Sequence, residues 1–361
     1  MFRFISFCEY YLSITLFLYI YRFSSDENHV LFEYKHDAGN IVSVGFERDC
    51  KWIYSCGEDQ TIRIWDTRSN ACLKIFQTGA AVNCVCLDPN EQDILISGDQ
   101  NGCVKLWSVS SLSLDRSTVP VTQALEEHNT LPDLPVRSIA ISVGTNLVCV
   151  GSHRGRVFIY KLLPAMAGLQ LLHDFVAHEE YLLHCAIDPR SANLATSSAD
   201  RSIKIWDLSN VNILAKSTTE KKVQSSSSSS LSSTAAIAPI SPSVGGSSSA
   251  AGGGVSSTTS SNVASPVLAR DLVSPGSPIP NSSSSTGGGG GCSVVCVRTL
   301  SHHQRWVWNT VYSSESIFLV SASSDNTAKL WNVETGEVLR NLTGHTHAVT
   351  CVALNDQIYN R

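Results

Sequence analysis

Residues 198–207 read SADRSIKIWD, and this stretch decides the fold because three close copies of it recur along the chain. GEDQTIRIWD ends at Asp66, GDQNGCVKLW ends at Trp107, and SSDNTAKLWN ends at Asn332. Each copy begins with turn-forming residues, and an Asp in such a turn can accept hydrogen bonds from nearby backbone N–H groups. Apolar side chains then fall at every second position, which is the pattern of a β-strand with one face buried. The recurring unit is therefore a tight turn followed by a strand that ends near an aromatic residue.

The copies are regularly spaced. Trp65 and Trp107 are 42 residues apart, Trp107 and Tyr160 (a weaker copy, GSHRGRVFIYK) are 53 apart, and Tyr160 and Trp206 are 46 apart. The interval from Trp206 to Trp331 is 125 residues, but it returns to the same range once an insert of about 80 low-complexity residues is set aside. A period of roughly 40–45 residues is typical of a β-propeller in which each repeat supplies one four-stranded blade. Since one blade cannot bury its faces alone, blades pack around a ring, and the sequence predicts an all-β fold.

Strand patterns predict how many blades the chain holds. Innermost strands are expected at six places, which are Ile41–Phe46, Val82–Leu87, Val136–Ile141, Leu183–Ile187, Val307–Tyr312 and Val349–Leu354. The first five are each followed by three further strand patterns; for the first blade these are Trp52–Ser55, Thr61–Trp65 and Cys72–Phe76. We therefore predict five full blades and two stray strands. The stray strands are the sixth innermost strand and a lone outer strand, Val30–Tyr34, that precedes the first blade.

Two segments differ in composition from the blades. Residues 1–28 form an apolar leader, which we interpret either as a replacement for strands native to the fold or as a signal-anchor-like segment. Its uncharged run, residues 10–21, is shorter than the ~20 residues that span a bilayer. Residues 217–296 are rich in Ser and Gly and poor in large apolar residues, so we expect a disordered insert. The blades then occupy residues 29–216 and 297–361, with the last blade incomplete.

Composition limits the classes of partner. The net charge is −5 and the isoelectric point about 6.1, and no basic stripe is present, which argues against nucleic acid as a partner. Twelve cysteines are scattered without any C-x-x-C pair, so we expect no zinc site and reduced thiols of a cytoplasmic protein.

The sequence contains no persuasive catalytic constellation. His302, His303, His345 and His347 lie near no nucleophile or carboxylate pair at a catalytic spacing. The five-glycine run at residues 287–291 is low-complexity sequence and does not lie between a strand and a helix as a phosphate loop does. We therefore expect no enzyme activity, no catalytic residue, no cofactor, no metal and no small-molecule substrate.

Three longer stretches resemble one known family. HQRWVW at residues 303–308 with SASSDNTAKLW ending at Trp331, LISGDQNG at residues 95–102, and Gly344-His345 with VALND at residues 352–356 are similar to the small WD-repeat subunit of target-of-rapamycin kinase complexes. This family is also called G-protein-β-subunit-like or "lethal with sec thirteen". The resemblance covers about residues 29–215 and 297–356. Members are seven-bladed propellers with leading strands that this chain does not match.

The resemblance implies roles for individual residues. Blade-forming Asp and His residues pair, which makes His36 with Asp59 and His178 with Asp200 the expected pairs, and the remaining blade-motif residues are Trp65, Trp107, Trp206, Asp325 and Trp331. The family subunit is non-catalytic, docks on the C-lobe of the kinase's catalytic domain with other subunits of the complex, and acts in nutrient and growth signalling. Trp306 and Trp308 match aromatic positions on its kinase-facing surface.

Two alternatives stay open. Trp306 and Trp308, which alternation places on one side of their strand with Val307 on the other, could instead fill the packing between blades. The chain could also be a WD-repeat adaptor of another pathway, such as a ubiquitin-ligase receptor. The resemblance places the protein in the cytoplasm, reaching the cytosolic face of endomembranes through the complex.

Overall fold

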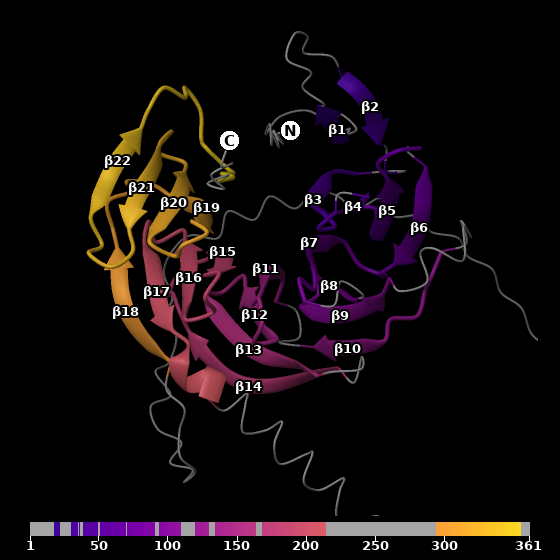
Figure 1. Ribbon diagram of the computed structural model, residues 1–361, viewed down its shortest axis with the longest axis horizontal. Coiled ribbons are helices and arrows are strands. Elements are labelled where there is room, and N and C mark those ends of the chain that lie inside the picture. Colours follow the sequence, from indigo (N-terminus) through magenta and orange to yellow (C-terminus); the bar gives the residue numbers. More distant parts are fainter. Residues whose placement is uncertain are drawn as a thin grey trace, which may run out of the picture. The chain divides into compact units, whose positions relative to one another are not determined.

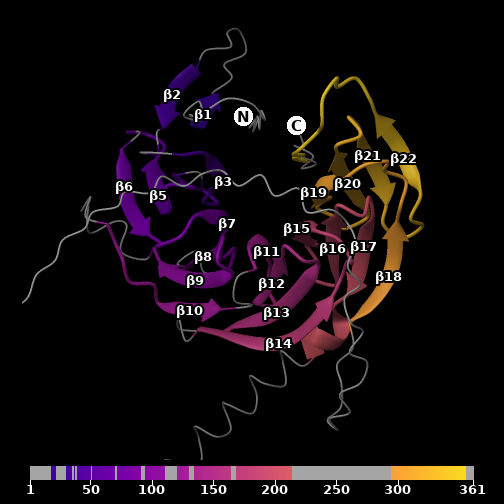
Figure 2. The same ribbon diagram turned by 180° about the vertical axis from the view of Figure 1, so that it is seen from behind.

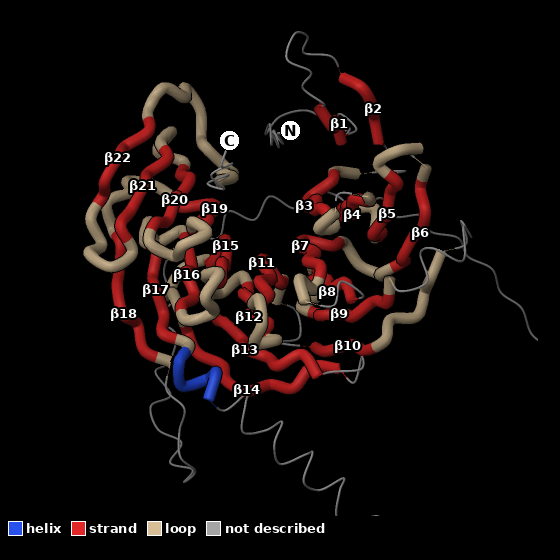
Figure 3. Tube along the Cα trace, viewed as in Figure 1, coloured by secondary structure: helices blue, strands red, loops and turns tan. Residues whose placement is uncertain are grey.

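The computed structural model describes residues 18–21, 30–34, 36, 39–49, 51–69, 71–90, 94–109, 120–129, 134–163, 168–213 and 294–354. The leader apart from residues 18–21, and the insert apart from residues 294–296, lie outside the described residues. In the part of the chain that is described, helix is confined to residues 209–213 (Figure 3). No helix among these residues is long and apolar enough to cross a membrane.

The described strands form five four-stranded antiparallel sheets, as the repeats predict. In each sheet the strands are adjacent in chain order, so every sheet is a meander. The first sheet comprises β3 (Ile41–Phe46), β4 (Trp52–Gly57), β5 (Thr61–Asp66) and β6 (Cys72–Gln77). The second comprises β7 (Val82–Leu87), β8 (Ile94–Asp99), β9 (Cys103–Ser108) and β10 (Glu126–Asn129).

The remaining three sheets follow the same order. The third comprises β11 (Val136–Ile141), β12 (Leu147–Ser152), β13 (Arg156–Leu163) and β14 (Gly168–Val176). The fourth comprises β15 (Leu182–Ile187), β16 (Asn193–Ser198), β17 (Ile203–Asp207) and β18 (Val295–Leu300). The fifth comprises β19 (Val307–Tyr312), β20 (Phe318–Ser323), β21 (Ala328–Asn332) and β22 (Val338–Leu342).

Neighbouring sheets meet at their first strands. β3 contacts β7, β7 contacts β11, β11 contacts β15, and β15 contacts β19. Figures 1 and 2 show the same succession from two sides, with the first strand of each sheet beside the first strand of the next. The sheets therefore stack face to face in chain order, as the blades of a propeller do.

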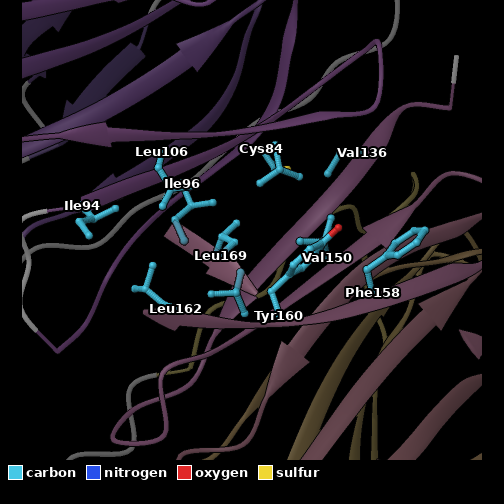
Figure 4. Packing of buried hydrophobic residues seen from close by; sticks show 12 residues of the cluster. Cys84, Ile94, Ile96, Leu106, Val136, Val150, Phe158, Tyr160, Leu162 and Leu169 are labelled. Atoms are coloured by element: carbon cyan, nitrogen blue, oxygen red, sulfur yellow. The ribbon is translucent and has the colours of Figure 1, made fainter. Parts of the chain in front are cut away.

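The two faces of each sheet are buried against different neighbours, because side chains alternate along a strand. In β8, Leu95 packs into the cluster shared with the first sheet, whereas Ile94 and Ile96 pack into the cluster shared with the third. Figure 4 shows this second cluster, in which Ile94, Ile96 and Leu106 face Val150 and Tyr160. Similar apolar clusters lie between the third and fourth sheets and between the fourth and fifth. The hydrophobic core of the protein is thus divided into layers between the sheets.

The sequence between β17 and β18 interrupts the fourth sheet without breaking it. The two strands pair antiparallel, with Asp207 opposite Val295, although 87 residues separate them. The insert was predicted to end at residue 296, but β18 begins at Val295. The predicted boundary was wrong by two residues because Val295 and Cys296 extend the ladder beyond a register shift at Trp206.

Two predicted strands differ in the structure. Val30–Tyr34, predicted to be a lone strand, is β2 and pairs antiparallel with β1 (Leu18–Tyr21) from the predicted leader. Val349–Leu354 was predicted to be an innermost strand, but no strand is described there. A strand requires a partner ladder, and in this segment the hydrogen bond from Val349 N–H to Ser323 O is the only backbone bond to a neighbouring sheet among the described residues.

Candidate partner-binding site

Three sheets contain the same buried chain of four polar groups. In the first sheet Trp65 Nε1 donates to Ser55 Oγ (2.8 Å), Ser55 Oγ lies 2.7 Å from His36 Nε2, and His36 Nδ1 lies 2.9 Å from Asp59 Oδ2. The predicted Asp59–His36 contact is thus present as one link of a longer network. We call each such network a tetrad.

The fourth sheet repeats the tetrad with Thr in place of Ser. Trp206 Nε1 donates to Thr196 Oγ1 (2.9 Å), which lies 2.8 Å from His178 Nε2, and His178 Nδ1 lies 2.7 Å from Asp200 Oδ2. The predicted partners His178 and Asp200 are therefore also in contact.

The fifth sheet has a tetrad that includes a residue missed by the sequence analysis. Trp331 Nε1 donates to Ser321 Oγ (2.8 Å), which lies 2.7 Å from His303 Nε2, and His303 Nδ1 lies 2.7 Å from Asp325 Oδ2. Two signals could have found these partners. His178 and His303 each precede the innermost strand by four residues, and the hydroxyl residue precedes its Trp by ten in all three tetrads.

The second sheet keeps only part of this network. Trp107 Nε1 donates to Ser97 Oγ (2.9 Å), but Thr78 stands four residues before β7, where His178 and His303 stand before their strands. Asp99 Oδ1 instead accepts the backbone N–H groups of Asn101 and Cys103 (3.0 and 2.8 Å). Without a histidine partner, burial raises the pKa of Asp99 despite these two bonds.

The Asp of each tetrad stays ionised because its hydrogen bonds outweigh its burial. Burial opposes ionisation of Asp200, but the hydrogen bonds from His178 and Ser202 lower its pKa to about 2. For Asp325 the opposing burial is likewise overcome, here by Thr327 and His303, and the pKa is again about 2. The pKa of Asp59 is lowered against burial by His36 and Thr61. These charge-assisted bonds tie the turn between the second and third strands to the loop before the first strand.

The tetrads have the Asp–His–Ser order of a hydrolase triad, but their hydroxyl groups cannot serve as nucleophiles. Ser55, Thr196 and Ser321 are 0% exposed, so no substrate reaches them. Each hydroxyl oxygen also accepts the indole N–H of its Trp, which occupies a lone pair that a nucleophile needs. The geometry is that of a structural clamp.

A second repeated feature lies where the innermost strands begin. Each of the five innermost strands has a register shift one residue after its start, centred on Val42, Asn83, Arg137, Leu183 and Trp308. The residue just before each strand accepts, through its carbonyl, a 2.9 Å bond from the turn after the second strand; these residues are Asn40, Ala81, Pro135, Tyr181 and Trp306. We call the surface formed by these two sets of residues the bulge end. Since a β-bulge re-aims side chains out of the ladder, the bulge end is suited to present them to a partner.

Trp306 and Trp308 both belong to the bulge end. Trp306 is 43% exposed, whereas Val307 between them is 0% exposed, in agreement with the predicted alternation. Their ring centroids lie 5.6 Å apart with planes inclined by 60°. Trp308 is partly buried and donates its Nε1–H to Ser324 Oγ (2.5 Å). Neither residue belongs to the hydrophobic clusters between the sheets in the part of the chain that is described.

The described cysteines and potential metal-binding side chains form no reactive or metal-binding site. The nine described cysteines are free, and burial raises the pKa of seven of them, including Cys84, Cys149 and Cys185. Within the described residues no group of three His, Cys, Asp or Glu side chains could hold a metal ion.

A family model matches the chain at four of its repeats. The family model "WD domain, G-beta repeat" matches residues 25–66, 70–108, 169–207 and 294–332. From residue 70 on, each matched segment contains the outermost strand of one sheet and the first three strands of the next. Each repeat in the sequence is therefore shared between two neighbouring sheets, so the chain itself connects them. The copy that ends at Tyr160 in place of Trp is not matched.

Several curated proteins are similar to this chain. Target of rapamycin complex subunit LST8 of Mus musculus is 34% identical over 203 residues, covering 55% of this chain and 59% of the relative. Subunit LST8-1 of Arabidopsis thaliana is 30% identical over 193 residues, covering 53% and 60%. Subunit wat1 of Schizosaccharomyces pombe is 26% identical over 197 residues, covering 54% and 59%.

The match thus spans about three fifths of the length of these relatives. The recurring turn–strand–Trp unit, the five four-stranded sheets and the named relatives agree. The chain therefore contains segments that match WD repeats, has an all-β, propeller-type fold, and is similar to LST8 subunits of target of rapamycin complexes.

Proposed function

We propose that this chain is a non-catalytic scaffold subunit of target of rapamycin complexes that docks on the kinase's catalytic domain and stabilises it. The relatives that support this proposal are named as target of rapamycin complex subunits in mouse, thale cress and fission yeast. The observation that carries it is the exposed Trp306 beside Trp308 at the bulge end.

Large aromatic side chains are suited to this role. Trp is enriched among the few residues that carry most of the binding free energy of an interface, since it buries a large area while losing little conformational freedom. An exposed Trp contributes little to the fold, so an interface role is the physical reason we assign to Trp306. Trp308, held by Ser324, keeps the pair in a fixed orientation.

The proposal includes no chemistry by the chain itself. The Asp–His–Ser chains of this protein are buried and their hydroxyl groups are occupied, so they stabilise the blades. Its partners are then the C-lobe of the kinase domain and other subunits of the complex. The protein acts in the cytoplasm and reaches the cytosolic face of endomembranes through that complex, and it takes neither nucleic acid nor a small-molecule substrate.

The experiment compares the variant Trp306→Ala/Trp308→Ala with the unchanged chain, both tagged and expressed in cells of the source organism. We expect the double variant to lose the target of rapamycin kinase on affinity purification while its thermal unfolding midpoint changes little. Trp306→Ala alone is expected to weaken kinase recovery with no change in the midpoint, because this side chain is exposed.

Phe318→Ala is the matched control. Phe318 is an exposed aromatic residue at the opposite end of the same sheet, where β20 begins. It should leave kinase recovery unchanged. If the double variant instead unfolds at a much lower temperature, the two Trp residues fill blade packing, and the proposed surface is wrong.

A further inference from the structure

The chemistry of the bulge end changes from sheet to sheet. The first two sheets present Asn40, Ala81 and Asn83 there, together with the exposed apolar Val42. The third sheet presents Arg137, and the fourth presents Tyr181. Since the five positions are equivalent in backbone geometry, these differences reflect the side chains alone.

Tyr181 extends the aromatic part of this surface beyond the Trp pair. It occupies in the fourth sheet the position that Trp306 occupies in the fifth, and the two are similarly exposed, at 45% and 43%. Its ring stacks on His153 of the third sheet, with centroids 4.2 Å apart and planes inclined by 18°. The stack joins the aromatic residues to the third sheet.

Four arginines surround these aromatic residues. Arg154 and Arg201 lie in turns between second and third strands, Arg305 precedes Trp306, and Arg137 lies at the register shift of β11. Among the described residues none of their side chains forms a hydrogen bond or an ion pair. Arg137 Nε is buried without a hydrogen-bond partner, and so is Nδ1 of the neighbouring His153. Burial and the charges of Arg137 and Arg154 lower the pKa of His153.

An unpaired buried nitrogen is costly, because it has given up water without gaining a partner. The arrangement therefore leaves two buried nitrogens, Arg137 Nε and His153 Nδ1, without a hydrogen-bond partner among the described residues. Three glutamates near this end do not accept hydrogen bonds from these arginines. Glu58 is bound to Asn40, and the exposed Glu179 and Glu180 form no ion pair with these arginines.

We propose that Arg137 and Arg154 bind a carboxylate side chain of the kinase next to Tyr181, so that the bulge end recognises an acidic residue together with apolar ones. This inference rests on the proposed function, because it names the chemistry of the same surface. A guanidinium offers a planar pair of donors that matches a carboxylate, and Arg, Tyr and Trp are the residues enriched in binding hot spots.

The spacing of the sheets limits where the acidic residue lies in the partner. Arg137 and Trp308 are separated by two sheet-to-sheet steps, from β11 to β15 and from β15 to β19. Face-to-face sheets are about 10 Å apart, and an extended chain advances about 3.3 Å per residue. An extended partner segment would thus carry its acidic residue within about six positions of the residue that contacts Trp306 and Trp308.

The test measures the affinity of the full chain for the purified catalytic domain of the target of rapamycin kinase at about 50 mM and about 300 mM salt. We expect Arg137→Met/Arg154→Glu to weaken binding at least tenfold at low salt and much less at high salt, since salt screens charge pairs. Trp306→Ala/Trp308→Ala should weaken binding similarly at both salt concentrations. Arg190→Glu, in the turn at the opposite end of the fourth sheet, makes the same charge change as Arg154→Glu at an exposed Arg and should stay within twofold of the unchanged chain.

The outcomes separate the two proposals. If the arginine variant binds as the unchanged chain does while the Trp variant does not, the carboxylate contact is wrong and the docking surface stands. An arginine effect that is equal at both salt concentrations also contradicts the contact. If the unchanged chain does not bind, or if both variants bind normally, the docking surface itself is wrong. Thermal unfolding of the arginine variant should not occur earlier than that of the unchanged chain, because Met removes an unpaired buried nitrogen.

Discussion

At the scale of the residue, Ser321 shows how this sequence specifies its blades. One buried hydroxyl accepts the Trp331 indole and contacts His303, which in turn contacts Asp325. Each of these polar groups is buried or nearly so and each has a partner, which removes the cost of burying it. The tetrad therefore selects one arrangement of turn, strand and loop.

The pKa of Asp325 makes its contribution depend on pH. Its folded-state pKa of about 2 is below the ordinary value of 3.8, so the folded protein binds this proton less readily than the unfolded chain. The stabilisation is complete above pH 4 and is lost as pH falls toward 2. Asp325→Asn should therefore lower the free energy of unfolding by about 1–3 kcal/mol near pH 7.

The difference in the free energy of unfolding between the unchanged chain and Asp325→Asn should shrink as the pH is lowered from 5 to about 2. At low pH the unchanged chain becomes protonated at Asp325 and loses the same charge. Urea unfolding at a series of pH values measures it. Asp49→Asn is the control, since Asp49 forms an exposed ion pair with Lys51 and should leave stability unchanged. A deficit that stays constant with pH would contradict the assignment of charge to Asp325.

The sequence predicted part of this residue-level network. His36–Asp59 and His178–Asp200 were expected as pairs and are in contact. His303 was missed because two adjacent histidines, His302 and His303, precede β19, and only the strand start identifies which one is in register. The hydroxyl partners were missed because Ser and Thr ten residues before a Trp carry no signal in a single repeat.

At the scale of the element, strands with an alternating pattern of buried apolar residues could be predicted from the sequence. A strand that forms only because a partner strand pairs with it could not. The bounds of β3, β7, β11 and β19 equal the predicted ones, because period-2 patterns of apolar residues fix them. β1 was not predicted, since nothing in the leader's composition distinguishes a paired strand from an apolar tail. The register shifts at the bulge end were also unpredicted, because a one-residue bulge leaves the alternation of buried residues almost intact.

Gly151 tests how closely neighbouring sheets approach. A Cβ at this position would lie 2.5 Å from Leu182 Cδ2 and 2.8 Å from Cys185 Sγ, both in the fourth sheet. Gly151→Ala should therefore cost about 1–3 kcal/mol through overpacking. In a Leu182→Ala background the same change should cost much less, because the clashing methyl group is gone. A double-mutant cycle by urea unfolding measures this coupling, and equal costs in both backgrounds would show that the sheets do not meet there.

At the scale of the whole molecule, stability should vary from sheet to sheet. The third sheet contacts both the second and the fourth through β11, whereas the fifth exposes apolar side chains. These exposed residues are Ile317, Phe318, Leu339 and Leu342, each 36–49% exposed. In a repeat protein the stability of each unit depends on its neighbours.

Hydrogen exchange followed by mass spectrometry measures this gradient. Amides in β12 and β13 should exchange more slowly than those in β20 and β21, and residues 343–348, which form no ladder, should exchange fastest among the described residues. Equal protection of the third and fifth sheets would mean that the exposed face of the fifth sheet is covered in solution.

Affinity purification of the tagged full chain from its own cells, followed by quantitative mass spectrometry, measures most directly which partner this chain binds. We predict that the target of rapamycin kinase is the most enriched partner and that it disappears with Trp306→Ala/Trp308→Ala. Enrichment of a ubiquitin ligase or another pathway's complex, without this kinase, would contradict the proposed role in target of rapamycin complexes.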